Sequence, residues 1–225
     1  GKDDKNTVYT SQGEFSAGYV INTAGLYADR IAHMFGFGQN LKILPFKGLY
    51  LYCTDPEETL GVHVYPVPDI DYPFLGVHHT VTVDGKLKIG PTAVPAFWRE
   101  QYSALSGFDM REFMEVLSSE CSLFMNSNFN FRGLASEELK KQFKKYMVEV
   151  ASKLVSGIRK ESYSAWGKPG IRAQLYDQTQ RNLVSDFCVQ GDSRSFHVLN
   201  AVSPAFTASI PFAEYCCDEI QKLID

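Results

Sequence analysis

The 225-residue sequence has no long uninterrupted apolar run and no excess of positive charge. No stretch approaches the roughly 20 apolar residues that cross a bilayer, and no signal-peptide pattern is visible, so we expect no transmembrane span. The 22 lysines and arginines stand against 26 aspartates and glutamates, which gives a formal net charge of −4. Because nucleic-acid binding needs a concentrated basic surface, we expect no nucleic-acid partner.

Cysteine and histidine are also scarce. The five cysteines form no C-x-x-C pair, and their odd number leaves one unpaired in any disulfide scheme, so a reducing compartment is the simpler interpretation. Three of the five histidines, His33, His63 and His197, lack the paired spacing of a metal site. The adjacent His78 and His79 cannot easily bind one ion from a regular strand. We therefore predict no metal site.

The chain lacks a G-x-G-x-x-G segment, the glycine-rich loop on which dinucleotide-binding folds hold a pyrophosphate. It does have enough apolar content for a packed core, because 44% of its residues are hydrophobic and 13% are aromatic. The sequence is therefore that of a globular protein with one large domain or two smaller ones.

Two segments place small residues after a strand. Residues 18–25 have the pattern of a short buried strand that ends at Ala24-Gly25, and a helical pattern follows over 27–35. Residues 197–209 form a β-type run that turns through Ser203-Pro204 into small residues able to open a helix. Such turns leave ligand space at the carboxyl edge of an α/β sheet, and exposed N–H groups at a helix start receive anions. A plain tight turn is the alternative at Ala24-Gly25.

Residues 43–90 are β-rich and contain a hairpin signal at Asp84-Gly85. If Val83 pairs with Lys86, strand alternation puts His78 and His79 on opposite faces of the sheet. The face of His78 then holds Thr80, Thr82, Leu87 and Ile89, and the face of His79 holds Val77, Val81, Val83, Lys86 and Lys88. A bulge would shift this register.

The second half of the chain is first helical and then mixed. Residues 103–160 have apolar positions at helical spacing, with interruptions around 126–130 and at Gly157, as expected of helices that cover a sheet. After Pro169 the sequence returns to strand-like segments and ends in a predicted helix.

Six segments together resemble the L-2-hydroxyglutarate dehydrogenase and oxidase family, which belongs to the FAD-dependent, D-amino-acid-oxidase-like enzymes. They are VINTAGLYADRIA at 20–32, PFKGLYL at 45–51, YPVPD at 65–69, FLGVHHT at 74–80, GIRAQ at 170–174 and HVLNAVSPAFTAS at 197–209. Such enzymes carry the G-x-G-x-x-G loop near their N-terminus. The resemblance therefore implies that this chain is similar to the C-terminal part of a longer enzyme.

The resemblance implies an α/β and α+β fold. In it, an incomplete FAD-binding, Rossmann-like domain is interleaved with an antiparallel-β substrate domain that helices cover. Residues 1–44 would form part of the FAD-binding domain, residues 45–165 the substrate domain, and residues 166–225 the return to the FAD-binding domain.

The activity that the resemblance implies is oxidation of L-2-hydroxyglutarate to 2-oxoglutarate, with hydride passing to FAD in the complete enzyme. It also implies a quinone or an electron-transfer partner as acceptor, with oxygen as the other option. The expected location is mitochondrial in a eukaryote, and cytoplasmic or peripheral to the inner membrane in a bacterium. The alternatives are another FAD-dependent hydroxy-acid or amino-acid oxidoreductase, and a non-enzymatic binding fragment.

Three residues are expected to act on the substrate. His78 matches the histidine of the family pattern FLGVH and is the candidate base, since a neutral imidazole can accept the hydroxyl proton; a structural histidine is the alternative. Arg172 in GIRAQ matches an arginine that holds the substrate carboxylate in relatives, and its planar fork suits that task. Lys47 would lie beside the flavin or contact the distal carboxylate, unless it is solvated. Arg99 is a further carboxylate candidate, although a surface position is favoured for it.

The remaining candidates are small or polar residues that the resemblance implies beside FAD. They are Ala24, Gly25, Gly48, Asn200, Ala201, Ser203, Pro204 and Ala205.

Overall fold

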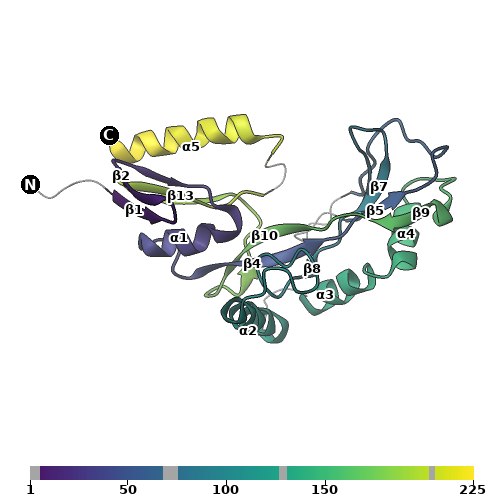
Figure 1. Ribbon diagram of the computed structural model, residues 1–225, viewed down its shortest axis with the longest axis horizontal. Helices are drawn as coiled ribbons and strands as arrows, with labels where there is room; N and C mark the ends of the chain where they lie inside the picture. Colours follow the sequence, from purple (N-terminus) through teal and green to yellow (C-terminus); the bar gives the residue numbers. More distant parts are fainter. Residues whose placement is uncertain (1–5, 68–75, 127–130, 203–205) are drawn as a thin grey trace, which may run out of the picture. The chain divides into compact units, whose positions relative to one another are not determined.

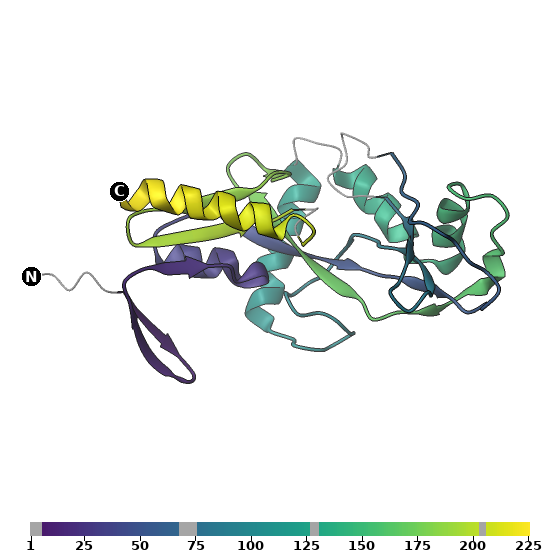
Figure 2. The same cartoon turned by 90° about the horizontal axis from the view of Figure 1, so that it is seen from above.

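The computed structural model describes residues 6–67, 76–126, 131–202 and 206–225 (Figures 1 and 2). The chain forms two compact units. Unit 1 comprises the residues up to Ile43 together with Ala173–Thr179 and Leu183–Asp225, and unit 2 comprises Leu44–Arg172 and Gln180–Asn182. The chain therefore enters unit 2 within one strand and leaves it within another.

Unit 1 is built on a three-stranded sheet with the order β12-β13-β3. Its strands are β3 (Val20–Asn22), β12 (Cys188–Gly191) and β13 (Ser195–Asn200). β13 runs parallel to β3 and antiparallel to β12. Parallel strands end at the same edge of a sheet, so the residues after β3 and those after β13 meet at one edge.

Two helices accompany this sheet. The short 3-10 helix η1 (Gly25–Tyr27) leads into α1 (Ala28–Met34), and α5 (Ser209–Ile224) closes the chain. Figure 1 shows α1 and α5 on opposite sides of the sheet. A hairpin of β1 (Asn6–Thr10) and β2 (Gly13–Ala17) precedes it. The core of the unit consists of Ala28, Ala32, Leu41, Ile43, Leu175 and Leu199.

Unit 2 contains an antiparallel sheet with the order β6-β7-β5-β9. Its strands are β5 (Leu51–Cys53), β6 (His78–Val81), β7 (Leu87–Gly90) and β9 (Tyr163–Trp166). One face of this sheet packs on α4 (Lys144–Ser152), and the shared core is Leu51, Val77, Ile89, Met147, Val148, Ala151 and Tyr163. The opposite face of the sheet carries His78.

Two further helices and a second sheet complete the chain. The helices are α2 (Met110–Asn126) and α3 (Phe131–Lys140), and the 3-10 helix η2 (Lys160–Ser162) precedes β9. The second sheet has the order β11-β10-β4-β8. It consists of β4 (Leu41–Gly48), β8 (Val94–Pro95), β10 (Gly170–Asp177) and β11 (Asn182–Leu183). β4 and β10 are the two strands within which the chain passes from one unit to the other.

The mixed fold class expected from the sequence is confirmed, with helices and antiparallel sheets in the expected order. The expected break in the helical region falls partly on residues 127–130, which lie outside the described residues. The expected domain boundaries stay a prediction. No helix within the described ranges combines the length and the apolar character needed to cross a membrane.

The register expected for the β6–β7 hairpin was wrong by one residue. The N–H of Thr82 donates to the carbonyl of Lys86, so the loop has three residues rather than two. Its last residue, Gly85, has a φ of +77°, the left-handed conformation that closes a three-residue hairpin loop. Thr80 therefore pairs with Lys88, and His79 pairs with Ile89. Lys88 shares the face of His78, whereas Leu87 and Ile89 lie on the face of His79.

Candidate functional site

Arg172 lines a small cavity in unit 2. The cavity has a volume of about 160 Å³ and is lined by Phe46, Gly48, Tyr50, Pro91, Thr92, Ala93, Gly170, Ile171 and Arg172. These residues come from the end of β4, the start of β10 and the segment after β7. Two of the sequence candidates, Arg172 and Gly48, therefore lie in one site.

The surroundings of Arg172 reduce the hydration of its guanidinium. By surface area the residue is exposed, yet the atoms around it lower the pKa of its guanidinium by desolvation, while Tyr50 and Glu138 oppose that shift. Because arginine stays protonated in proteins, the result is a partly desolvated cation. Such a cation binds a carboxylate more strongly than a fully hydrated one does.

Glu138 is the acidic neighbour of Arg172 and is itself held firmly. Its carboxylate is buried, with 4% of the residue exposed. One oxygen accepts the N–H of Ala93 at 2.5 Å, and the other pairs with Lys141. The carboxylate of Glu138 is therefore fixed by two partners on the α3 side of the cavity.

Thr92 fixes the loop that carries Gly48. Its hydroxyl donates to the carbonyl of Lys47 and accepts the N–H of Leu49, both at 3.1 Å. A Cβ at Gly48 would meet the Cβ of Pro91 at 3.1 Å, which is tighter than an ordinary contact. The close approach of these two loops explains the need for glycine at this position.

His78 is buried on the open face of the β6-β7-β5-β9 sheet, with 9% of the residue exposed. Its ring stacks on that of Tyr65, with 4.3 Å between the ring centroids. Its Nδ1 lies 3.0 Å from the carbonyl oxygen of Gly76, which can only accept, so Nδ1 carries the proton. Nε2 is then the unprotonated nitrogen and has the lone pair that a base needs.

Burial lowers the pKa of His78, and the charge of Lys88 lowers it further. The imidazole is thus neutral at neutral pH.

His79 faces the other way and donates from Nε2 to the carbonyl of Ala151 at 2.9 Å. The expectation that the two histidines point in opposite directions is confirmed, and His79 has a structural contact with α4.

Tyr50 connects the surroundings of Arg172 with those of His78. It lines the Arg172 cavity, and Nζ of Lys88 lies 4.3 Å from the centroid of its ring. Burial raises the pKa of Tyr50, with Arg172 lowering it and Tyr65 adding to the rise. Tyr65 is also the residue that stacks on His78. Sequence reasoning missed Tyr50, Tyr65 and Lys88, although both tyrosines lie in segments that carried the family resemblance.

Two other sequence candidates do not join this cavity. Lys47 is half-buried, and burial lowers the pKa of its amine, but its side chain is not among those that line the cavity. Arg99 is buried, with 2% exposed, and its N–H donates to Oε2 of Glu112 at 3.1 Å. The surface position favoured for Arg99 was therefore wrong, because α2 supplies a buried carboxylate beside it.

The candidates in unit 1 lie at the edge where β3 and β13 end. Gly25 and the pair Asn200 and Ala201 line one cavity of about 390 Å³, and the α5 side chains Phe212, Ala213, Cys216, Cys217 and Ile220 form much of its wall. Gly25 has a φ of +55°, and a Cβ there would meet no atom within 4 Å. Ser203, Pro204 and Ala205 lie outside the described residues.

Buried amides fix both ends of this edge. Asn22 accepts the N–H of Ala24 on Oδ1, and its Nδ2 donates to the carbonyl of Ala28 and to Nδ1 of His197. Asn200 donates from Nδ2 to the carbonyls of Val184 and Asp186. The side chains of Asn22 and Asn200 therefore hold the turns, and a ligand at this edge would meet mainly backbone and small side chains.

Comparison with known proteins places the chain in a family. The model of the family described as FAD dependent oxidoreductase (DAO) matches residues 2–219. The chain belongs to this family.

Two curated relatives of this FAD-dependent oxidoreductase chain share one name. An L-2-hydroxyglutarate dehydrogenase of Indibacter alkaliphilus is 39% identical over 214 residues, which cover 94% of this chain and 52% of that protein. A mitochondrial L-2-hydroxyglutarate dehydrogenase of Mus musculus is 39% identical over 233 residues, covering 98% and 49%. The chain spans about half the length of the curated relatives it matches.

A solved structure supports the fold of the family. The dithionite-reduced L-α-glycerophosphate oxidase of Mycoplasma pneumoniae with FAD bound superposes with a TM-score of 0.63 and is 20% identical. The match covers 100% of this chain and 48% of that one. At this identity the likeness shows the fold alone.

Proposed function

We propose that the protein containing this chain oxidises L-2-hydroxyglutarate to 2-oxoglutarate with FAD as its cofactor. The relatives that carry this name in a bacterium and a mammal support the substrate, and the family supports the cofactor. The observation that carries the proposal is the Arg172 cavity, because its wall residue Tyr50 is also a neighbour of the residues around His78. A carboxylate-binding cation and a neutral base thus belong to one region of unit 2.

The residues of unit 1 fit a flat and largely apolar ring. Gly25 has open space where a side chain would begin, Ala24 and Ala201 are small, and the adjoining cavity wall is mostly apolar. We assign Ala24, Gly25, Asn200 and Ala201 to contacts with the isoalloxazine, mainly through their backbone. Gly48 is proposed as a further contact with FAD. Bound FAD supplies the acceptor for a hydride from C2 of the substrate.

The side chains of unit 2 perform the remaining steps. Arg172 binds the C1 carboxylate through two parallel N–H groups, which fixes the position of C2. Nε2 of His78 accepts the proton of the C2 hydroxyl as the C2–H bond breaks and the C2=O bond forms. The substrate loses one hydride and one proton, and the proton ends on His78. Lys47 is proposed to act beside the flavin, since it does not line the cavity.

The electron acceptor and the location are separate proposals. A quinone or an electron-transfer partner would reoxidise the cofactor. The mouse relative is named as mitochondrial and the Indibacter relative is bacterial. By analogy with these two relatives, we propose that the protein is mitochondrial in a eukaryote. In a bacterium it would be cytoplasmic or peripheral to the inner membrane.

Anaerobic flavin reduction tests this function. The protein as its gene encodes it should be purified with FAD and mixed with L-2-hydroxyglutarate, its D-enantiomer, L-lactate or L-glutamate. Bleaching of the flavin spectrum by L-2-hydroxyglutarate, with formation of 2-oxoglutarate, is the expected result. Faster reduction by L-glutamate or by another hydroxy acid would assign the protein to a different flavin oxidoreductase. A protein that binds these acids without reducing the flavin would be a binding protein.

A further inference from the structure

Lys88 stands out in unit 2 because it is a cation without a carboxylate partner in the described part of the chain. The residue is half-buried on β7, and its amine lies over the ring of Tyr50, with 4.3 Å between Nζ and the ring centroid. By contrast, the neighbouring Lys86 pairs with Asp84 at 2.7 Å. A half-buried ammonium that has only an aromatic face beside it retains unsatisfied donors.

The corrected register decides where this cation points. Lys88 pairs with Thr80 on β6 and with Tyr52 on β5. It therefore projects from the same face of the sheet as His78, the face opposite to the α4 core. The charge of Lys88 reaches His78, where it disfavours the protonated ring. Lys88 thus belongs to the surroundings of the candidate base.

The same cation also lies near the Arg172 cavity. Tyr50 lines that cavity and is influenced by the charge of Arg172, and Lys88 lies over the ring of this tyrosine. Two permanent cations therefore flank one side chain. Glu138 is the acidic neighbour of Arg172, and it already pairs with Lys141. Two cations beside one tyrosine suit a ligand that carries two negative charges.

We propose that Lys88 binds the distal carboxylate of the substrate and thereby selects a dicarboxylic acid over a monocarboxylic one. The inference rests on the proposed function, and it adds the residue that decides chain length and charge. Arg172 would hold the carboxylate next to the reacting carbon, and Lys88 would hold the one at the other end. The ammonium then gains a charged hydrogen-bond acceptor in place of its contact with a ring alone.

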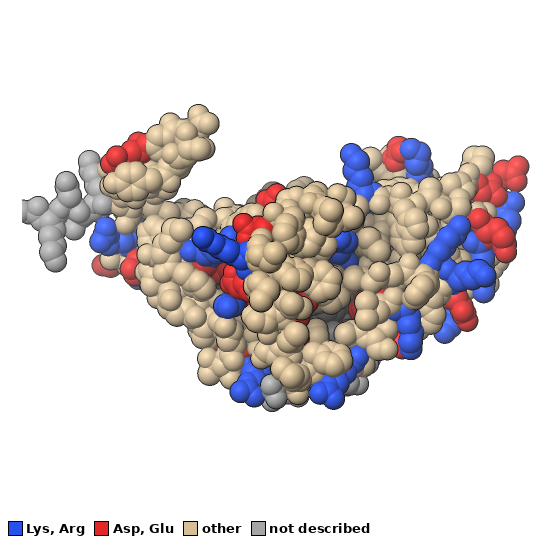
Figure 3. Space-filling model, turned by 60° about the horizontal axis from the view of Figure 1, so that its bottom comes forward, with Lys and Arg blue, Asp and Glu red and all other residues tan. Residues whose placement is uncertain are grey.

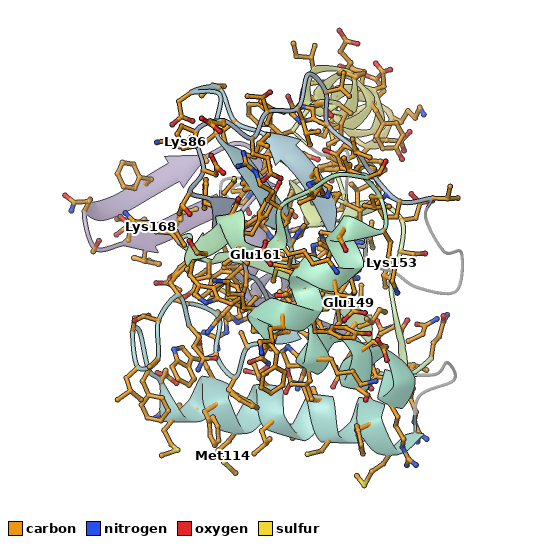
Figure 4. The ribbon with its side chains drawn as sticks, turned by 90° about the vertical axis from the view of Figure 1, so that its right-hand side faces the viewer. Lys86, Met114, Glu149, Lys153, Glu161 and Lys168 are labelled. Atoms are coloured by element: carbon orange, nitrogen blue, oxygen red, sulfur yellow. The ribbon has the colours of Figure 1, made fainter. Side chains whose placement is uncertain are left out.

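The other basic candidates for this task are less suited. Arg99 is buried beside Glu112. Lys47, like Lys88, does not line the cavity, but within the described residues it is Lys88 whose amine lies over the ring of the cavity residue Tyr50. Lys86 is exposed at the tip of the β6–β7 hairpin, where Figure 4 labels it, and it already has Asp84 as partner. Lys86 is therefore the matched control for Lys88, because both lysines lie on one hairpin.

The test compares selectivity in Lys88→Met, Lys88→Arg and Lys86→Met, using the flavin-loaded protein as its gene encodes it. The measured quantity is the ratio of kcat/KM for L-2-hydroxyglutarate to that for L-2-hydroxybutanoate. We expect Lys88→Met to lower this ratio by about 10- to 100-fold, since a charged hydrogen bond is lost. Lys88→Arg should restore much of the ratio, and Lys86→Met should leave it unchanged. An unchanged ratio in Lys88→Met, whether kcat/KM stays the same or falls equally for both substrates, would overturn the proposal.

A binding measurement separates this inference from the proposed reaction. The 225-residue chain and its variants are titrated calorimetrically with glutarate and with butanoate, neither of which can be oxidised at a C2 hydroxyl. Preference for glutarate that Lys88→Met abolishes and Lys86→Met retains would support the dicarboxylate site, even if L-2-hydroxyglutarate failed to reduce the flavin. Equal affinity of the wild-type chain for the two acids would contradict the site. Circular dichroism establishes that each variant is folded before it is titrated.

Discussion

The imidazole of His78 owes its properties to two neighbours that lie on different segments. The protonated Nδ1 donates a hydrogen bond to the carbonyl oxygen of Gly76, and the ring of Tyr65 stacks on the imidazole. A ring held in this tautomer does not need to rotate or to exchange its proton before it acts. At the scale of single residues, the candidate base is therefore already prepared in the absence of substrate.

We expect His78→Ala to lower the limiting rate of flavin reduction by about 100- to 10,000-fold, which is the usual contribution of a positioned base. The measurement is a single-turnover reaction with L-2-hydroxyglutarate in the flavin-loaded protein. His63→Ala is the comparison variant, because His63 is exposed: its Nδ1 accepts the N–H of Val81, and its ring lies edge-on to that of Tyr65 rather than on His78. A folded His78→Ala protein that reduces flavin at the normal rate would remove His78 from the mechanism.

Arg172→Lys tests whether the geometry of the guanidinium matters as well as its charge. A lysine keeps the positive charge but loses the planar two-point contact, so we expect both weaker binding and slower reduction. The concentration dependence of flavin reduction separates these two effects. Arg159→Lys is the matched control, since Arg159 is 53% exposed and pairs with Asp55 at the surface. Identical limiting rates and identical substrate dependence in Arg172→Lys would exclude Arg172 from the site.

At the scale of elements, α2 buries one face, and this face includes an ionisable carboxyl group. Its buried residues Glu112, Val116, Ser119, Glu120 and Leu123 recur at helical spacing and form one face. Met114 lies on the exposed side of the same helix (Figure 4). The buried face includes Glu120, whose Oε1 has no hydrogen-bond partner within the described chain. Burial raises the pKa of this carboxyl to about 8.

This carboxyl makes the stability of the protein depend on pH. Above its ordinary value of 4.5 the unfolded chain loses the proton, while the folded chain keeps it until pH about 8. The unfolded state then binds fewer protons, so the free energy of unfolding falls as the pH rises through this window.

We therefore expect Glu120→Gln to stabilise the protein by about 1–3 kcal/mol at pH 8 relative to its effect at pH 4.5. Urea unfolding of the 225-residue chain at the two pH values gives the difference. Glu149→Gln on α4 is the control, because Glu149 is exposed (Figure 4). Equal effects of Glu120→Gln at both pH values would show that the carboxyl is not protonated in the folded state.

The β3–β13 pair is the element that prepares the edge in unit 1. His197 accepts from Asn22 on Nδ1, so its Nε2 carries the proton and donates to Oγ of Ser195 at 3.1 Å. Burial lowers the pKa of His197, and the rings of Phe35 and Phe37 enclose it. A neutral His197 thus orients the amide that holds Ala24 in its turn.

At the scale of the whole molecule, acidic and basic side chains are interspersed on the face shown in Figure 3 rather than separated into fields of one sign. The net charge of −4 is small for a chain of 225 residues. Long-range electrostatics therefore give little steering, and recognition of the proposed anionic substrate would depend on the local cations around Tyr50.

The absence of a G-x-G-x-x-G loop from the 225 residues has a measurable consequence for the cofactor. The described edge of unit 1 is proposed to contact the flavin ring, whereas a pyrophosphate needs closely spaced backbone N–H groups at a helix start. We expect the 225-residue chain alone to lose FAD on desalting and to be colourless. The protein as its gene encodes it, treated in the same way, is the control. A stoichiometric flavin spectrum that survives desalting of the chain alone would contradict this expectation.

Much of the architecture follows from the sequence, because it depends on local periodicity. The strand before Ala24-Gly25, the helical pattern over 103–160 and the strand at GIRAQLY all occur, since hydrophobic spacing and turn residues act over a few neighbours. The opposite directions of His78 and His79 follow in the same way, because alternation along a strand has a period of two. The segments that carry the family resemblance are likewise a property of the sequence.

Only the tertiary structure decided the strand register and the contacts between residues that are distant in the sequence. Gly85 adds one residue to the hairpin loop, and this single step moves Lys88 to the face of His78. The burial of Arg99 depends on Glu112, thirteen positions away along the chain. The contact of Lys88 with Tyr50 joins a residue of β7 to one in the connection between β4 and β5. Local pattern fixes which residues alternate, but only the packed chain fixes which partner each face meets, because that choice follows from long-range contacts that no short window contains.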